Sequence, residues 1–320
     1  MTMPDPSVRD AAVMPARDNA ARVVVAGSSG LVGTALCALL CTRGHNLDRL
    51  VRRPAQAEGG EIRWDPARGE LDAGSLEGAD AVVNLAGEPI AAERWTDARK
   101  QAILTSRTEG TRLLCETLAR LSRRPGVLVS ASAVGYYGDR GEEWVTEESA
   151  AGAGFLADVC RQWEAATQPA REAGIRVVNL RIGVVLSTAG GALARMLPAF
   201  RFGLGGRIGT GRQYMSWITL DDLAAAVEHL LFASQISGPV NAVSPNPVTN
   251  AQFTKALGRV LRRPTFLSMP AFAVRLALGE MGEAVLLSGV RARPARLLAD
   301  GFPFRDPELE PALQRMLRQQ

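Results

Sequence analysis

A short apolar strand that leads through a glycine-rich turn into a helix is the strongest constraint on how this 320-residue chain folds. The β-branched run from Arg22 to Ala26 precedes Gly27-Ser-Ser-Gly30-Leu-Val-Gly33, and apolar residues then recur at helical spacing as far as Gly44. The first glycine of such a turn permits the tight bend, the second lets backbone amides reach a pyrophosphate, and the third lets the helix pack on the strand. A turn with a purely structural role does not need all three glycines. We therefore predict a dinucleotide site whose contacts come from Gly27, Ser29, Gly30, Leu31, Val32 and Gly33.

The end of the second strand indicates which nicotinamide cofactor binds, because the residue there contacts the adenosine ribose. An acidic residue at that point bonds the ribose hydroxyls of NAD, whereas an arginine accepts the 2′-phosphate of NADP. Counting 20 residues from Gly33 reaches Arg53, with Arg52 beside it and no acid within three positions. We predict that NADP(H) is the cofactor and that both arginines contact its phosphate. The alternative is a pair of surface arginines in front of Pro54.

Strands and helices alternate along the chain up to about residue 186. Strand patterns cover residues 47–51, 61–65, 81–86, 127–129 and 175–182, and helical patterns cover residues 96–121 and 155–173. Each crossover between parallel strands needs a helix to return the chain. The alternation therefore predicts an α/β fold, a doubly wound, Rossmann-like parallel sheet with helices on both faces.

The pattern changes in the last third of the chain. From about residue 186 glycine-rich loops mix with short helices, which indicates a smaller mixed second lobe, and residues 268–316 predict a C-terminal helical domain. The apolar positions of that domain are too many to leave in water, so we expect it to dock on the main body. They are Phe272, Val274, Leu276, Leu278, Val285, Leu286, Leu287, Leu297 and Leu298. We place the dinucleotide-binding domain at 22–245. Residues 1–21 are expected to be a disordered tail, or in part sequence upstream of a true start near Met14.

Composition and charge exclude several classes of protein. The hydrophobic fraction of 47% and the charged fraction of 22% are those of an ordinary globular protein, not of a disordered or coiled-coil chain. The net charge is +4, but the arginines are interleaved with acids along the length and no block of five like charges occurs. We therefore expect no nucleic-acid partner. A small molecule is the expected substrate, and the oligomeric state is left open.

Cysteine and histidine are too few and too scattered for a metal site or a disulfide framework. Cys37, Cys41, Cys115 and Cys160 form no CxxC pair, and the two histidines lie far apart. Scattered thiols are typical of a reducing cytoplasm, where we place the protein. Residues 23–42 lack charge for long enough to imitate a membrane span, but three glycines interrupt them, so we expect no membrane partner.

Further ordered motifs extend the glycine pattern along the chain. They are Asn84-Leu-Ala-Gly-Glu-Pro-Ile90, Arg94-Trp-Thr96, Ser106-Arg107, Ser130-Ala-Ser-Ala-Val-Gly-Tyr-Tyr-Gly138, Gly154-Phe-Leu-Ala-Asp-Val-Cys-Arg-Gln-Trp-Glu164, Leu180-Arg-Ile-Gly-Val-Val-Leu186, Ser216-Trp-Ile218 and Gly279-Glu-Met-Gly282. With them the chain resembles, over about residues 22–316, the extended short-chain dehydrogenase/reductases, and within these the atypical "epimerase family proteins". That subgroup has a domain similar to NAD-dependent epimerases/dehydratases, its own C-terminal helical domain and largely unassigned substrates.

The resemblance implies roles for individual residues. Leu85, Ala86 and Gly87 would line the adenosine and pyrophosphate, and Arg107 on the following helix would reach the cofactor. Arg52 matches the family's phosphate-end arginine. The segment from Ser130 to Ser132 ends a central strand on the carboxyl side of the sheet, where open α/β folds bind ligands. Ser130 is accordingly assigned to the cofactor, and Ser132 matches the family's active-site serine.

The chain departs from the family in its proton-transfer residues. Ordinary members use a tyrosine with a lysine four residues later, which lowers the pKa of the phenol. The three tyrosines here, Tyr136, Tyr137 and Tyr214, are followed at that distance by Arg140, Gly141 and Ile218, so no such pair exists. Ser132, Tyr136, Tyr137 and Glu88 are the candidates that replace it. The alternatives are that the tyrosines only pack the substrate loop and that Glu88 is a surface residue.

Two hypotheses about function follow. The first is an NADP(H)-dependent oxidoreductase or epimerase that acts on a small carbonyl or a compound similar to a sugar nucleotide. The second is a regulatory or interaction protein that binds NADP(H) and has lost turnover. The missing tyrosine and lysine favour the second, whereas Ser132, Glu88 and the elaborate second lobe favour the first.

Overall fold

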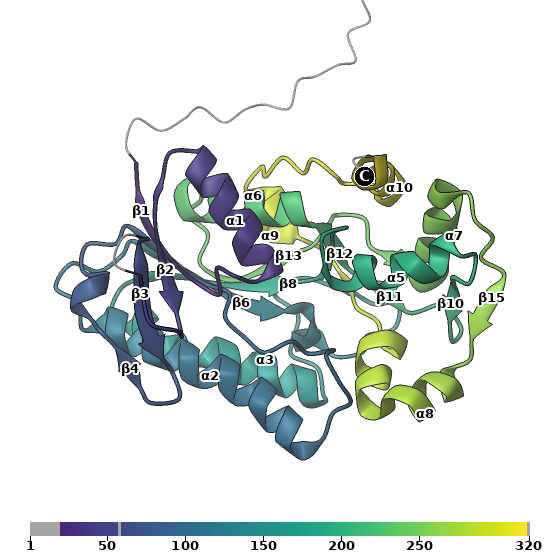
Figure 1. Cartoon of the computed structure of the whole chain (residues 1–320), viewed down its shortest axis with the longest axis horizontal. Coiled ribbons are helices and arrows are strands. Elements are labelled where there is room, and N and C mark those ends of the chain that lie inside the picture. The colour runs from purple at the N-terminus through teal and green to yellow at the C-terminus, as the bar shows by residue number, and fades with distance from the viewer. Residues whose placement is uncertain (1–19, 57–58, 319–320) are drawn as a thin grey trace, which may run out of the picture.

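An eight-stranded sheet forms the centre of the protein, whose structure is a computed structural model that describes residues 20–56 and 59–318 (Figure 1). Residues 1–19 of the predicted tail lie outside the described residues. The strand order is β13-β8-β6-β5-β1-β2-β3-β4, and every pair is parallel except β3 with β4. The strands are β1 (Arg22–Ala26), β2 (Asn46–Val51), β3 (Glu61–Asp65), β4 (Glu70–Leu71), β5 (Ala81–Asn84), β6 (Val127–Ala133), β8 (Arg176–Ile182) and β13 (Gly238–Ala242).

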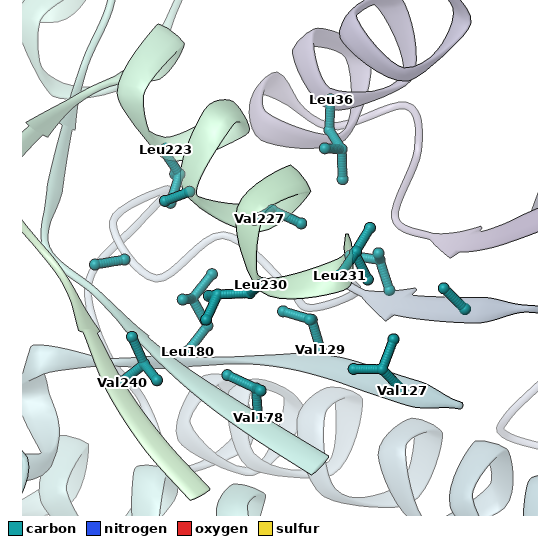
Figure 2. Packing of buried hydrophobic residues seen from close by; sticks show 14 of the residues in the cluster. Leu36, Val127, Val129, Val178, Leu180, Leu223, Val227, Leu230, Leu231 and Val240 are labelled. Atoms are coloured by element: carbon teal, nitrogen blue, oxygen red, sulfur yellow. The ribbon is translucent and has the colours of Figure 1, made fainter. Parts of the chain in front are cut away.

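Helices cover both faces of this sheet (Figure 1). One face carries α1 (Leu31–Thr42) and α6 (Leu220–Phe232), and the other carries α2 (Asp97–Ala119), α3 (Phe155–Ala165) and α4 (Gln168–Glu172). Figure 2 shows the first of the two resulting cores, in which α1 and α6 side chains such as Leu36 and Val227 face Val129 and Leu180 of the sheet. Because central strands are buried on both faces, they contain short continuous apolar runs, such as residues 23–26 of β1 and 127–129 of β6. The predicted doubly wound fold is confirmed.

The direction in which the strands are added changes at β1. The chain runs from β1 outward through β2 and β3, then returns to the other side of β1 and continues through β5, β6, β8 and β13. The helices that follow β1 and β5, α1 and α2, therefore lie on opposite faces of the sheet, which leaves a crevice at the carboxyl ends of these strands. In open α/β sheets this crevice is where ligands bind.

The second lobe consists of short strands and helices outside the sheet. They are β9 (Val184–Leu186), α5 (Gly191–Arg201), β10 (Gly206–Ile208), β11 (Tyr214–Met215), β12 (Trp217–Thr219), β14 (Val248–Thr249), α7 (Asn250–Leu261) and β15 (Leu267–Met269). The strands pair as β9–β12, β10–β15 and β11–β14. A capping box formed by Thr249 and Gln252 fixes the start of α7. The fully buried Trp217 and Phe253 lie in the core of this lobe.

The C-terminal residues fill cores that belong to the rest of the protein. They form α8 (Ala271–Gly282), a π-helical turn (Glu283–Leu287), β16 (Arg291–Ala292), α9 (Ala295–Ala299) and α10 (Leu309–Arg318). Leu297 of α9 packs into the sheet core, α10 packs into the core of the second lobe, and β16 pairs with β7 (Trp144–Val145). The segment is therefore not helical throughout. Between its helices the chain runs as β16 and loops, which connect the separate sites where the helices pack.

The expectation that all the apolar positions of this segment are buried is wrong for four of them. Val274 of α8 is fully buried, but Phe272 and Leu276 are 70% and 77% exposed, and Val285 and Leu298 are exposed as well. The helix is also interrupted at Gly279, whose φ of +60° is left-handed, so only one short face of α8 meets the body. Sequence periodicity counts apolar residues and does not say whether each has a surface to pack against.

We expect Leu313→Ala to lower the free energy of unfolding by about 2–5 kcal/mol, because Leu313 of α10 is fully buried and its removal leaves a cavity. Leu276→Ala removes the same atoms from an exposed site and is the matched control, with an expected change within about 0.5 kcal/mol. Urea denaturation of the full chain measures both. Equal losses in the two variants would contradict the placement of α10.

Candidate cofactor site and adjoining charge cluster

The turn after β1 has a shape that only glycine allows at two positions. Gly27 has a φ of +79°, and a Cβ on it would lie 2.7 Å from the Leu85 carbonyl carbon. A Cβ on Gly33 would lie 2.1 Å from the Gly27 carbonyl oxygen. The turn therefore packs against the loop after β5 without room for a side chain. This contact brings the predicted cofactor residues of the two loops together.

The N-terminus of α1 opens at this turn without a capping side chain. Gly30 is the N-cap residue, no side chain accepts a hydrogen bond from the first turn, and that turn contains no acidic residue. The amide groups of the first turn and the positive end of the helix are thus left for an anion. The arrangement fits a pyrophosphate.

A pocket of about 1040 Å³ lies at the carboxyl ends of β1, β2 and β5. The predicted site residues that line it are Gly27, Ser29, Gly30, Arg52, Arg53, Leu85, Ala86, Gly87 and Glu88. Its volume is at the upper end of that of small-molecule sites. Residues from three strand ends, predicted separately from the sequence, thus surround one cavity.

The two arginines after β2 differ in what they already contact. Arg53 makes a two-pronged ion pair with Glu61 of β3, with 2.8 Å between Nη1 and Oε2, and this hydrogen bond lowers the pKa of Glu61. Arg52 has a side chain that is 76% exposed, and its ion partner is Glu88 at 3.9 Å. Arg52 is therefore the one available to a phosphate. For both arginines to bind the phosphate, as the sequence predicts, Arg53 must break its ion pair with Glu61.

Five predicted cofactor residues do not line the pocket. Leu31, Val32 and Gly33 lie in the first turn of α1, and Ser130 is fully buried beside Asn84. Arg107 is also buried, which lowers its pKa, and it donates hydrogen bonds to the carbonyl oxygens of Glu88 (2.9 Å) and Ile103 (3.0 Å). Arg107 thus supports the loop after β5 from behind.

A buried charge cluster lies under the end of β6. Ser132 donates a hydrogen bond to Glu164 Oε1 (2.7 Å), and Arg181 donates two to the same carboxylate (2.8 and 2.9 Å). Arg181 is 3% exposed and Ser132 is 2% exposed. Burial alone lowers the pKa of Arg181, but the hydrogen bonds to Glu164 reverse the direction and raise it, so the side chain stays charged.

Both tyrosines of the predicted site pack against this cluster. The Arg181 guanidinium lies 3.4 Å from the centre of the Tyr136 ring. The Tyr137 hydroxyl donates to Asn241 (2.7 Å) and accepts from Arg181 (3.0 Å), and burial raises the pKa of Tyr137 to about 12. A fully buried phenol with this pKa keeps its proton at neutral pH. The placement of Tyr137 favours the packing role that was the sequence-based alternative.

Glu164 and Arg181 are the site residues that sequence reasoning missed. Both belong to quoted motifs, but a motif names residues without their partners. The parallel register of β6 and β8 places Arg181 directly beside Ser132, and α3 brings Glu164 over both. The signal that could have found Arg181 is a charged residue between Leu180 and Ile182, inside a predicted buried strand. Within residues 20–56 and 59–318, no group of three or more His, Cys, Asp and Glu side chains is arranged to hold a metal ion.

Family models match most of the chain. The NAD dependent epimerase/dehydratase family matches residues 23–242, and the domain of unknown function DUF1731 matches residues 269–316. The epimerase family protein Mb2239 of Mycobacterium bovis is 49% identical over 292 residues, which are 91% of this chain and 96% of that protein.

No helix in the described part of the chain is both long and apolar enough to cross a membrane.

Two solved structures show the same fold. The crystal structure of human epimerase family protein SDR39U1 with NADPH has a TM-score of 0.86 and 36% identity, covering 93% of this chain and 100% of that one. A nucleoside-diphosphate sugar epimerase from Corynebacterium glutamicum has a TM-score of 0.78 and 40% identity, and the match covers 93% of this chain and 58% of that longer one. The resemblance inferred from the motifs is confirmed. The chain belongs to the NAD-dependent epimerase/dehydratase family, among the epimerase family proteins that carry a DUF1731 domain.

Proposed function

We propose that the protein binds NADP(H) in the pocket after β1 and uses it as an oxidoreductase or epimerase on a small carbonyl compound or one similar to a sugar nucleotide. The observation that carries the proposal is Arg52, an exposed arginine on the rim of a pocket that also contains the uncapped start of α1. One end of the pocket suits a pyrophosphate and the other a 2′-phosphate. The NADPH in the crystals of human SDR39U1 supports the same cofactor here.

The cofactor supplies the hydride, and the chain supplies positioning near Ser132. Because the Ser132 hydroxyl donates its hydrogen bond to Glu164, only the lone pairs of its oxygen remain for a ligand. It therefore accepts a hydrogen bond from a substrate hydroxyl. Glu88 stands nearer the cofactor pocket, where Arg52 and Arg99 lie 3.9 and 3.5 Å from its carboxylate, and it is the second candidate for holding a proton.

The second candidate function is a protein that binds NADP(H) without turnover. The observation that favours it is the engagement of Ser132, which is 2% exposed and already bonded to Glu164. The tyrosine and lysine of ordinary members are also missing. Lys100, one of the chain's two lysines, is held by Glu280 of α8 at 2.8 Å, which raises the pKa of Lys100 and keeps it charged.

Steady-state oxidation of NADPH with a panel of carbonyls and UDP-sugars tests the choice. We expect slow turnover by the wild type, because a missing positioned proton donor lowers a rate by about 10²- to 10⁴-fold. The rate should fall further in Ser132→Ala and stay unchanged in Lys100→Ala and Tyr137→Phe. Tyr136→Phe tests the remaining tyrosine. A wild-type kcat above about 10 per second would show that another group replaces the tyrosine fully. Tight NADPH binding without turnover on any compound would favour the second candidate.

We also propose a cytoplasmic location, as the scattered cysteines suggested. All four cysteines are free thiols, and three of them are buried. In protein isolated with its thiols blocked at lysis, we expect alkylation of every cysteine after unfolding and no disulfide in the mass spectrum. A disulfide between any two of them would contradict the proposal.

A further inference from the structure

The second lobe and the first part of α8 have a charge distribution unlike the rest of the chain. Residues 186–220 and 248–279 contain no aspartate or glutamate but nine basic residues: Arg195, Arg201, Arg207, Arg212, Lys255, Arg259, Arg262, Arg263 and Arg275. Contrary to our expectation, arginines and acids are therefore not interleaved along the whole chain, because these two segments contain no acid. The net charge of +4 hides it, because the remaining residues have an excess of acids.

The same segments hold most of the exposed large apolar side chains. Phe202 and Phe266 are each 81% exposed, and the others are Leu204, Leu267, Met269, Phe272 and Leu276. Single exposed apolar residues are normal on a protein surface, but seven in these two segments need an explanation. We call these seven residues, together with Lys255, Arg259, Arg262 and Arg263, the basic apolar face.

Contacts between the elements join this face into one surface. Arg263 at the end of α7 donates a hydrogen bond to the Arg201 carbonyl oxygen at the end of α5 (2.8 Å), just before Phe202. The pairing of β10 with β15 then places Leu267 and Met269 beside the segment that follows Leu204. Phe272 and Leu276 stand one turn apart on α8, which begins two residues after β15. Figure 1 shows α7, β10, β15 and α8 together, at the opposite end of the molecule from β2, β3 and β4.

An open pocket of about 390 Å³ adjoins the apolar side chains. Four cations line it, Lys255, Arg259, Arg262 and Arg263, together with Gly258, Pro264 and Thr265, immediately before Phe266. Arg259 is paired with Glu310. Within residues 20–56 and 59–318, no carboxylate lies within ion-pair distance of Lys255 or Arg262. The pocket thus offers unpaired positive charge next to exposed phenylalanine.

Three kinds of partner are candidates to cover the basic apolar face: a second copy of this chain, a nucleic acid and a lipid bilayer. A second copy in a symmetric dimer sets the cations of the pocket against themselves, which like-charge repulsion opposes. A nucleic acid pairs with the cations, but its bases stack on flat rings and gain little from Leu204, Leu267, Met269 and Leu276. A bilayer with anionic headgroups satisfies both parts, because phosphates meet the cations while aliphatic and aromatic side chains enter the acyl boundary.

We propose that the basic apolar face docks the protein on an anionic lipid surface, with lipid phosphates in the pocket around Lys255 and Arg262. The expectation of no membrane partner rested on the lack of a spanning segment, and a surface contact needs none. The pocket around Lys255 and Arg262 shares no lining residue with the cofactor pocket, so a lipid phosphate bound there does not occupy the cofactor site.

Co-sedimentation of the full chain with vesicles tests the proposal. We expect binding to vesicles of phosphatidylcholine and phosphatidylglycerol in a 3:1 ratio, weak or no binding to pure phosphatidylcholine, and a marked loss between 0.1 and 0.5 M NaCl. Lys255→Ala with Arg262→Gly should lower the partition coefficient about 30-fold. Arg262 has a left-handed φ of +53°, so glycine removes the charge without opposing the fold.

A second variant and a matched control separate the face from net charge. Phe266→Ser with Phe272→Ser should lower binding at least about 10-fold by removing the inserted side chains. Arg68→Ala with Arg123→Ala removes two charges from exposed sites near β4 and the end of α2, and should leave vesicle binding within about twofold. NADPH affinity, measured in every variant, checks that the chain is folded.

Three results would overturn the proposal. The first is equal binding to neutral and anionic vesicles, or binding to neither. The second is an equal loss in the control variant, which would assign the attraction to net charge alone. The third is that Phe266→Ser with Phe272→Ser abolishes a dimer seen by light scattering, or abolishes binding to a 30-nucleotide single strand that is tighter than binding to vesicles.

Discussion

Glu164→Ala lowers the free energy of unfolding by about 3–5 kcal/mol in urea denaturation, because it leaves the Arg181 guanidinium buried without its counter-charge. Arg181 is 3% exposed, so water cannot replace the two hydrogen bonds that the carboxylate accepts. Ser132 loses its acceptor in the same variant. The expected loss is a large share of the total stability of an ordinary domain.

Two further variants separate this effect from loss of an ion pair in general. Glu148 accepts a hydrogen bond from Arg296 at 2.8 Å, but its side chain is 80% exposed, so Glu148→Ala should cost less than about 1 kcal/mol. Glu164→Leu combined with Arg181→Met removes both buried charges, and should be more stable than Glu164→Ala. A loss below about 1 kcal/mol for Glu164→Ala would mean that Arg181 finds another partner.

Arg52→Ala should reduce the preference for NADPH over NADH by about 10- to 150-fold, the size of one charge-assisted hydrogen bond to a phosphate. Arg53→Ala should have a smaller effect, since Arg53 is already paired with Glu61. Isothermal titration of both variants with both cofactors gives the ratios. A larger change in Arg53→Ala than in Arg52→Ala would show that the Arg53 pair opens when the cofactor binds.

The parts of the site that could be predicted are those set by local rules. The turn from Gly27 to Gly33 follows from residues next to each other, and its shape needs no distant partner beyond the packing against Leu85. The convergence of Arg52 and Ala86 on the same pocket follows from the rule that parallel strands end at one edge of the sheet. Strand positions from hydrophobic runs were sufficient for both.

The parts that could not be predicted depend on pairing between distant segments. That Arg53 turns to Glu61 depends on β2 lying beside β3, and that Ser132 meets Arg181 depends on the register of β6 and β8. A buried arginine contradicts the ordinary preference of strands, and only the carboxylate of Glu164 makes it acceptable. Phe272 was expected to be buried because apolar periodicity carries no information about whether a partner surface exists.

If Arg52 selects NADP(H) by its 2′-phosphate, the wild-type chain must distinguish the reduced forms of the two cofactors. Isothermal titration of the full chain with NADPH and with NADH at 25 °C measures this selection. We expect a Kd for NADPH at least about 10-fold below that for NADH, with the difference reduced at high salt because it comes from a charge. Equal affinities, or tighter binding of NADH, would contradict it.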